Sequence, residues 1–281
     1  MQNILGIIGS KRKSGNCEVV VKEISRQLPV EHRLTLLRLP DFDIRHCSGC
    51  YRCLVKEDRC VIEDDLPVVL EAIAAADALI LAVPTYFLAA HSCLKVLIDR
   101  GLSFYSMADR LWEKPAVGVG VAGIRGKEGS TLLDIEKFFA TILADNKQSE
   151  IIYGALPGET MLSKANRQVA KDLGQRLFGL KKMHAGPHCS LCGGQTFRFL
   201  PDGRVRCMLC SESGNLQVRD GQLALDIEMG EHPVLANRTA ALKHRDWLLG
   251  MVARFSEDRD KLKAVRREFA DKAEYVKPGE R

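Results

Sequence analysis

Eight of the ten cysteines in this chain of 281 residues fall into two groups of four. Cysteine thiolates that lie close together in a sequence are typical of metal sites and redox centres, because they are soft ligands for zinc, iron and iron–sulfur clusters. The sequence therefore predicts two metal centres. Their ligands are Cys47, Cys50, Cys53 and Cys60 for the first group, and Cys189, Cys192, Cys207 and Cys210 for the second.

In the first group, three cysteines follow one another at intervals of three, and six residues separate Cys53 from Cys60. One loop can then supply all four thiolate ligands of a compact metal centre, as a cubane iron–sulfur cluster requires. Zinc more often takes two separated pairs of ligands. We interpret this group as the ligands of a [4Fe–4S] cluster, with structural zinc, a disulfide pair and free thiols as the alternatives.

The second group consists of two Cys-x-x-Cys knuckles separated by fourteen residues. Two such knuckles bring four thiolates into a tetrahedron, as in a zinc ribbon. The residues between them predict a strand at 196–200, a turn at 201–203 and a strand at 205–207. A closed site of this kind indicates structural zinc, and iron, as in rubredoxin, is the alternative. We interpret the arginines of this segment as a solvated face.

Apolar runs and helical patterns alternate from residue 1 to about 180, which predicts an α/β fold with a five-stranded parallel sheet wound on both faces. The predicted strands are 4–8, 32–39, 78–83, 116–121 and 150–153, and the predicted helices are 16–28, 64–76, 92–102, 130–143 and 164–180. Such sheets bind ligands at the carboxyl ends of their strands. We therefore expect the binding residues in the loops that follow the strands.

The loop after the first strand, residues 9–16, favours a phosphate group. Glycines allow the backbone to approach an anion, and the N–H groups at the start of the next helix point toward it. Ser10, Ser14 and Asn16 add neutral polar groups, and Arg12 adds a cation. The loop has neither the Gly-Lys-Ser/Thr ending of a P-loop nor a GxGxxG dinucleotide fingerprint.

This loop resembles the Gly-Ser-Pro-Arg-Lys-x-Gly-Asn-Thr pattern of the NADPH-dependent FMN reductase and iron–sulfur flavoprotein group. The sequence departs from the pattern at Lys11, which is usually proline, and at Cys17, which is usually threonine. Three further segments are similar to that group: 84–87 after the third strand, 94–100 with Leu-Lys-x-x-Ile-Asp-Arg, and 60–65 with Cys-x-Ile-x-Asp-Asp. The resemblance covers about residues 1–180.

The resemblance implies a flavodoxin-like FMN-binding domain in which the cofactors carry the chemistry. No residue is assigned as catalytic. The implied FMN-binding residues are Ser10, Arg12, Ser14, Asn16, Cys17, Pro84, Thr85, Tyr86, Phe87, Ala122 and Gly123.

We expect three parts: an FMN-binding domain at 1–184 with its cluster loop at 47–60, a four-cysteine ribbon at 185–222, and a helical tail at 223–281. The formal net charge is +5 and the pI is near 8.6. These values do not indicate the cluster of basic residues that is typical of a nucleic-acid-binding surface. No membrane span or signal peptide is evident, so we expect a cytoplasmic protein.

The sequence thus predicts an oxidoreductase that transfers electrons between FMN, a [4Fe–4S] cluster and an external redox partner, either a ferredoxin or NAD(P)H. The alternatives are an NAD(P)H-dependent FMN or quinone reductase without a cluster, and a redox-sensing module that docks a partner through the ribbon. Relatives with this fold usually form dimers or tetramers, so the resemblance implies a homodimer or homotetramer.

Overall fold

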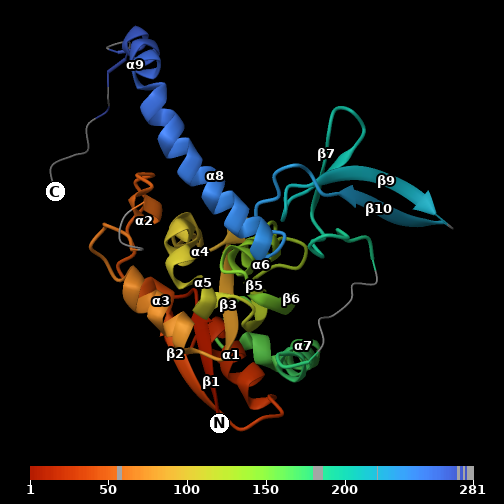
Figure 1. The fold of residues 1–281 in the computed structure, drawn as a ribbon. Coiled ribbons are helices and arrows are strands. Elements are labelled where there is room, and N and C mark those ends of the chain that lie inside the picture. The colour runs from red at the N-terminus through yellow and green to blue at the C-terminus, as the bar shows by residue number, and fades with distance from the viewer. Residues whose placement is uncertain (56–58, 180–185, 220, 271–272, 275, 277–281) are drawn as a thin grey trace.

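A computed structural model describes residues 1–55, 59–179, 186–219, 221–270, 273–274 and 276. Its central feature is a parallel sheet with the strand order β2-β1-β3-β5-β6 (Figure 1). The strands are β1 (Gln2–Ile8), β2 (His32–Arg38), β3 (Ala78–Tyr86), β5 (Pro115–Ala122) and β6 (Asp145–Tyr153). The predicted doubly wound five-stranded sheet is confirmed.

Helices cover both faces of this sheet, and each face has its own hydrophobic core. One face packs against α3 (Leu66–Ala75), α4 (Ser92–Asp99) and α6 (Thr131–Thr141), and the other against α1 (Asn16–Arg26) and α7 (Lys164–Arg176). Strands buried on both faces read as continuous apolar runs, and all six residues from Ala78 to Val83 are buried.

The elements differ from their predicted bounds mainly where the chain leaves the core. β6 begins at Asp145, five residues before the predicted strand, because an edge strand needs apolar residues on one face only. The helix predicted at 92–102 ends at Asp99, and the tighter helix η2 (Gly101–Met107) follows it. The helix predicted at 164–180 ends at Arg176, and residue 180 lies outside the described residues. Shorter elements are η1 (Leu39–Asp41), α2 (Arg52–Val55), β4 (Ala89–Ala90), α5 (Ala108–Leu111) and η3 (Glu159–Leu162).

The second group of cysteines belongs to a separate antiparallel sheet with the order β10-β9-β8-β7. Its first two strands, β7 (Phe197–Phe199) and β8 (Val205–Cys207), follow the predicted strand–turn–strand pattern. The hairpin of β9 (Ser213–Arg219) and β10 (Gln222–Glu228) was not predicted. The expected boundary at 222–223 falls within this hairpin, and the one at 184–185 lies outside the described residues.

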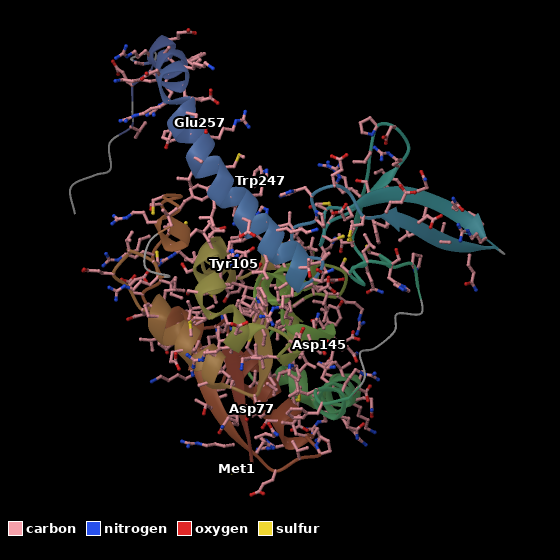
Figure 2. All side chains as sticks on the ribbon, viewed as in Figure 1. Met1, Asp77, Tyr105, Asp145, Trp247 and Glu257 are labelled. Carbon is pink, nitrogen blue, oxygen red and sulfur yellow. The ribbon has the colours of Figure 1, made fainter. Side chains whose placement is uncertain are left out.

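The chain ends in two helices, α8 (Arg238–Glu257) and α9 (Arg259–Glu268). Figure 2 shows α8 starting beside the flavodoxin-like body near Tyr105 and extending away from it toward Glu257. The Tyr105 hydroxyl donates to the Ala241 carbonyl at 3.1 Å, and the Arg238 guanidinium lies over the Trp112 ring at 4.9 Å. Among the apolar side chains of α8, Leu248 is buried, whereas Trp247 and Phe255 remain about half exposed.

Within the described residues, no helix combines the length and the apolar character that crossing a membrane requires.

The sheet packs closely against α6 at Gly118, and a substitution there tests this packing. A Cβ atom there would lie 2.4 Å from Ile135 Cγ2 and 2.8 Å from Ser149 Oγ. Gly118→Ala should lower the free energy of unfolding by about 1–3 kcal/mol through overpacking. The control is Gly250→Ala in α8, where a Cβ meets nothing within 4 Å, and it should raise stability by roughly 0.5–1 kcal/mol. Urea unfolding of both variants measures this, and an unchanged Gly118→Ala would contradict the packing.

Candidate flavin pocket and cysteine sites

The loop between β1 and α1 opens onto a pocket of about 240 Å³ at the carboxyl ends of the strands. Eight of the eleven predicted FMN-binding residues line this pocket, and Ser14, Phe87 and Ala122 do not. The lining residues are Ser10, Arg12, Gly15, Asn16, Cys17, Pro84, Thr85, Tyr86, Val121, Gly123, Gly154, Ala155 and Pro157.

The start of α1 provides a place for an anion in this pocket. Gly15 is the N-cap, and within the described residues no side chain caps the helix. The first N–H groups of the helix therefore need an acceptor, which a phosphate supplies. A Cβ atom at Gly15 would lie 2.9 Å from Arg12 Cβ and 3.1 Å from the Arg12 carbonyl oxygen, so the turn has room for glycine only. These features fit the phosphate of FMN.

The Glu18 carboxylate stabilises the conformation of the phosphate loop. Ser14 has a left-handed backbone, with φ 54°, and its N–H donates to the Glu18 carboxylate at 2.9 Å. Lys22 and Arg38 also donate to that carboxylate, at 2.6 and 2.8 Å. The hydrogen bond from Lys22 is the main reason that the pKa of Glu18 lies below its usual value. The buried carboxylate is thus ionised, and two cations offset its charge.

Asn16 links the phosphate loop to the loop that follows β6. Its side-chain amide donates to the carbonyls of Gly154 and Leu156, at 3.1 and 3.0 Å, and its carbonyl oxygen accepts from Thr160 at 3.2 Å. The Asn16 side chain therefore positions a second wall of the pocket. Sequence reasoning missed this wall, although the rule that ligands bind at the carboxyl ends of parallel strands also applies to β6.

Cys17 takes the position that threonine usually holds in the family pattern. Its side chain is 3% exposed, and burial, helped by the nearby Cys93, raises the pKa of the thiol to about 12. The thiol is therefore neutral at physiological pH. A neutral thiol is a weaker hydrogen-bond donor than a hydroxyl.

The second predicted flavin loop forms a strained hairpin at the end of β3. Thr85 and Tyr86 pair with Ala90 and Ala89, so only Phe87 and Leu88 make the turn. Both turn residues have positive φ values, 47° and 65°, which two-residue hairpins require but non-glycine residues seldom adopt. The Ser130 N–H stabilises the turn by donating to the Leu88 carbonyl at 2.7 Å. As a result, the Phe87 ring is fully exposed beside the pocket.

The cysteines of the first group lie in a loop that curls on itself before α3. The backbone is left-handed at Gly49 and Tyr51, and the Gly49 N–H donates to Cys47 Sγ at 3.4 Å. Cys47 and Cys50 are exposed, whereas Cys53 and Cys60 are half-buried. Among the described residues, no three of these thiols lie as close together as those of the second group do.

A buried ion pair fixes the end of this loop to the body. The Arg100 guanidinium donates to Asp64 at 2.5 Å and to the Arg45 carbonyl at 2.7 Å. Both charged side chains are almost fully buried, with exposures of 1% and 0%. Burial raises the pKa of Asp64, but hydrogen bonds from Arg100 and from the Arg45 and Leu66 N–H groups outweigh it and hold the pKa below its usual value. The loop is thereby attached to the end of α4.

The four thiols of the second group form a compact site. Their sulfur atoms all lie within 4.8 Å of one another. Cys189 Sγ is 3.7 Å from Cys210 Sγ, and Cys192 Sγ is 3.5 Å from Cys207 Sγ. A tetrahedral metal with bonds of about 2.3 Å to sulfur separates its ligands by about 3.8 Å, so the site fits zinc or iron. Two of the ribbon arginines, Arg204 and Arg219, form ion pairs with Asp202 and Asp226.

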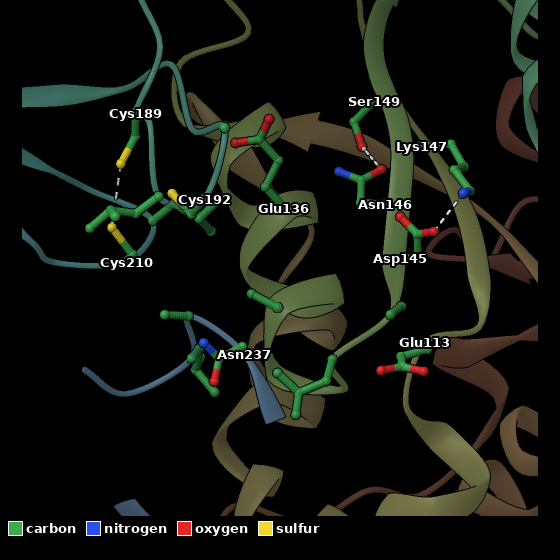
Figure 3. A pocket seen from close by; sticks show the side chains of 18 of the residues that line it. Glu113, Glu136, Asp145, Asn146, Lys147, Ser149, Cys189, Cys192, Cys210 and Asn237 are labelled. Carbon is green, nitrogen blue, oxygen red and sulfur yellow. Dashed lines mark hydrogen bonds and ion pairs between the residues drawn. The ribbon is translucent and has the colours of Figure 1, made fainter. Parts of the chain in front are cut away.

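A larger cavity, of about 450 Å³, lies between the ribbon and the parallel sheet. Figure 3 shows Cys189, Cys192 and Cys210 across from Glu136 of α6. The cavity is lined by the first part of β6, from Asp145, whereas the phosphate pocket lies beyond the end of β6, at Gly154. Along an extended strand, Gly154 is about 16 Å from Ser149, the last β6 residue of the cavity, and about 30 Å from Asp145. The four-thiol site of the ribbon therefore lies toward the amino ends of the strands, whereas the phosphate pocket lies at their carboxyl ends.

The parallel doubly wound sheet and the phosphate-type loop at its carboxyl edge define a flavodoxin-like protein. The family model for NADPH-dependent FMN reductases matches residues 2–144, which is half of the chain. The chain belongs to this family and is a flavin oxidoreductase, with FMN as the cofactor that the family indicates.

Two curated relatives extend this similarity. An iron–sulfur flavoprotein of Methanocaldococcus jannaschii is 28% identical over 192 residues, which are 64% of this chain and 97% of that protein. An iron–sulfur flavoprotein of Methanosarcina thermophila is 31% identical over 136 residues, or 47% of this chain and 70% of that protein.

Among solved structures, a flavone reductase resembles the chain over nearly its whole length. The TM-score is 0.73 at 17% identity, and the match covers 99% of this chain and 100% of that chain. At this identity the likeness concerns the fold, and it includes the ribbon and the tail helices.

Cys17→Thr should strengthen FMN binding about threefold to tenfold, because one net hydrogen bond contributes about 0.5–1.5 kcal/mol. Fluorescence titration of the flavin-free protein with FMN measures the dissociation constant. Cys17→Ala is the matched control, since it removes the thiol without adding a hydroxyl. Equal affinities for the two variants would show that the side chain at this position does not reach the phosphate.

Cys207→Ser should remove the metal of the second site and expose residues 188–228 to proteolysis, because a ribbon of this size depends on its metal. Metal analysis and limited proteolysis test this, with Cys93→Ser as the control that should behave as the wild type. Full metal content in Cys207→Ser would contradict the four-thiolate site.

Proposed function

We propose that this protein is an oxidoreductase that transfers electrons between FMN, a [4Fe–4S] cluster bound by Cys47, Cys50, Cys53 and Cys60, and an external redox partner. The observation that carries the proposal is the first cysteine loop, whose four thiols follow one another within fourteen residues and whose end is attached to α4 by a buried ion pair. The matching relatives named iron–sulfur flavoproteins support it.

The chain contributes binding and orientation. FMN can accept two electrons and release them singly, and the cluster carries one at a time. The α1 N-terminus and Arg12 bind the phosphate, and Asn16 and Glu18 hold the surrounding loops in place. Tyr86, which lines the pocket, is about half exposed and Phe87 next to it is fully exposed, so a ferredoxin or a nicotinamide has access to this side of the flavin site.

The second metal site is proposed to hold zinc with a structural role. Four buried or half-buried thiolates leave no open coordination position for a substrate. This site lies toward the amino ends of the strands and the phosphate pocket lies at their carboxyl ends, which argues against electron transfer between the two sites within one chain. The two ion-paired arginines weaken the alternative of a basic docking face.

A second candidate is a flavin reductase that uses NAD(P)H and has no cluster. Two observations favour it: the first-group thiols are not gathered as closely as those of the ribbon, and the flavone reductase shares the fold of the whole chain. In this case the open pocket beside Phe87 would receive a flat, conjugated acceptor such as a quinone or a flavone.

Metal analysis after purification without oxygen distinguishes the two candidates. The proposed function requires FMN, about four iron and four sulfide per chain, and one zinc. Cys50→Ala should lose iron and sulfide and keep zinc and FMN, whereas Cys207→Ser should lose only zinc. Wild-type protein with FMN and zinc but without sulfide would establish the reductase without a cluster.

A further inference from the structure

The segment that follows α4 presents two buried polar side chains to the first group of cysteines. Arg100 is 1% exposed and Ser103 is 4% exposed. The Ser103 hydroxyl lies within hydrogen-bonding reach of the Cys53 thiol. The Arg100 guanidinium lies beside Cys60 as well as beside Asp64. Each of the two side chains thus lies beside a different cysteine.

Packing between secondary-structure elements also places these two residues near the cysteines. α2, which carries Cys53, packs against η2, which carries Ser103. Cys60 packs against the hydrophobic core on the same face of the sheet. The geometry of this contact therefore depends on the body of the fold and not on the exposed part of the loop.

Arg100 has one donor that its ion pair does not use. Its terminal nitrogens bind Asp64 and the Arg45 carbonyl, whereas Nε is buried and has no hydrogen-bond partner among the described residues. A buried guanidinium N–H without an acceptor is unfavourable. The sulfur atoms of an iron–sulfur cluster are acceptors of the kind that is missing here.

Stability alone does not account for this arrangement. A buried ion pair adds little net stability compared with apolar side chains of similar volume. The arrangement is explained if the positive charge and the spare N–H serve the anionic group that four cysteines bind. A cluster with four thiolate ligands carries net negative charge, which becomes more negative when the cluster is reduced.

We propose that Arg100 and Ser103 form the floor of the first cysteine site and donate hydrogen bonds to the sulfur atoms of Cys60 and Cys53 when the cluster is bound. This inference rests on the proposed function. The two residues are positioning residues that raise the reduction potential of the cluster, because positive charge and hydrogen bonds to sulfur stabilise its more negative, reduced form.

The test is a redox titration of the cluster, followed by electron paramagnetic resonance, in the full-length protein purified without oxygen. Ser103→Ala should shift the potential to more negative values, equivalent to a threefold to tenfold change in the one-electron equilibrium constant, where tenfold corresponds to 59 mV. Ser106→Ala is the matched control: Ser106 is an exposed serine of η2 whose hydroxyl donates to the Ser103 backbone carbonyl, and the cluster potential of this variant should equal that of the wild type.

Arg100→Lys should retain iron but shift the potential to more negative values, because lysine keeps the charge and loses the guanidinium geometry. Arg100→Gln should lose most of its iron and sulfide, and a melting curve shows whether it still folds. If Arg100→Gln does not fold, Ser103→Ala and Arg100→Lys decide the question.

The outcomes separate this inference from the proposed function. A wild-type protein without iron and sulfide would overturn both. A wild-type protein with a full cluster, together with wild-type potentials in Ser103→Ala and Arg100→Lys, would overturn only the role of these two residues. A negative shift in both variants, with no shift in Ser106→Ala, would support it.

Discussion

The ion pair between Arg100 and Asp64 connects the end of the cysteine loop with the end of α4, the helix that follows the hairpin at Phe87. Asp64 ends the cysteine loop and accepts hydrogen bonds from the Arg45 and Leu66 backbone, so one carboxylate closes the loop and starts α3. Arg100 ends α4, whose first turn follows the flavin hairpin. Removing the charge of either partner alone would leave an uncompensated buried charge, which costs about 3–5 kcal/mol.

The parallel sheet and most of the residues that line the candidate phosphate pocket could be predicted because they depend on local patterns: buried apolar runs, glycines at a strand end and a helix start. The loop after β6 could not be found in this way, since it enters the pocket through hydrogen bonds from Asn16, which is far away in the sequence. The hairpin of β9 and β10 was missed because its strands are mostly exposed, although the Asp-Gly pair at 220–221 is a turn signal.

The ribbon differs from the domain in the source of its stability. Its core is small and includes Cys189, Cys207 and Cys210 themselves, next to Val205 and Ile227. The thiols are therefore at once ligands and core residues, and the sheet of β7 to β10 has little else to hold it together. Its contact with the domain surrounds a cavity of about 450 Å³.

The length of α4 has an evolutionary consequence. The helix has eight residues and spans about 12 Å, with the flavin hairpin before it and Arg100 immediately after it. Deleting or inserting one residue would rotate Arg100 by about 100° around the helix axis and turn it away from Asp64. In descendants of this gene, an insertion within α4 therefore survives only if it adds a whole turn or is matched by a compensating change in the cysteine loop.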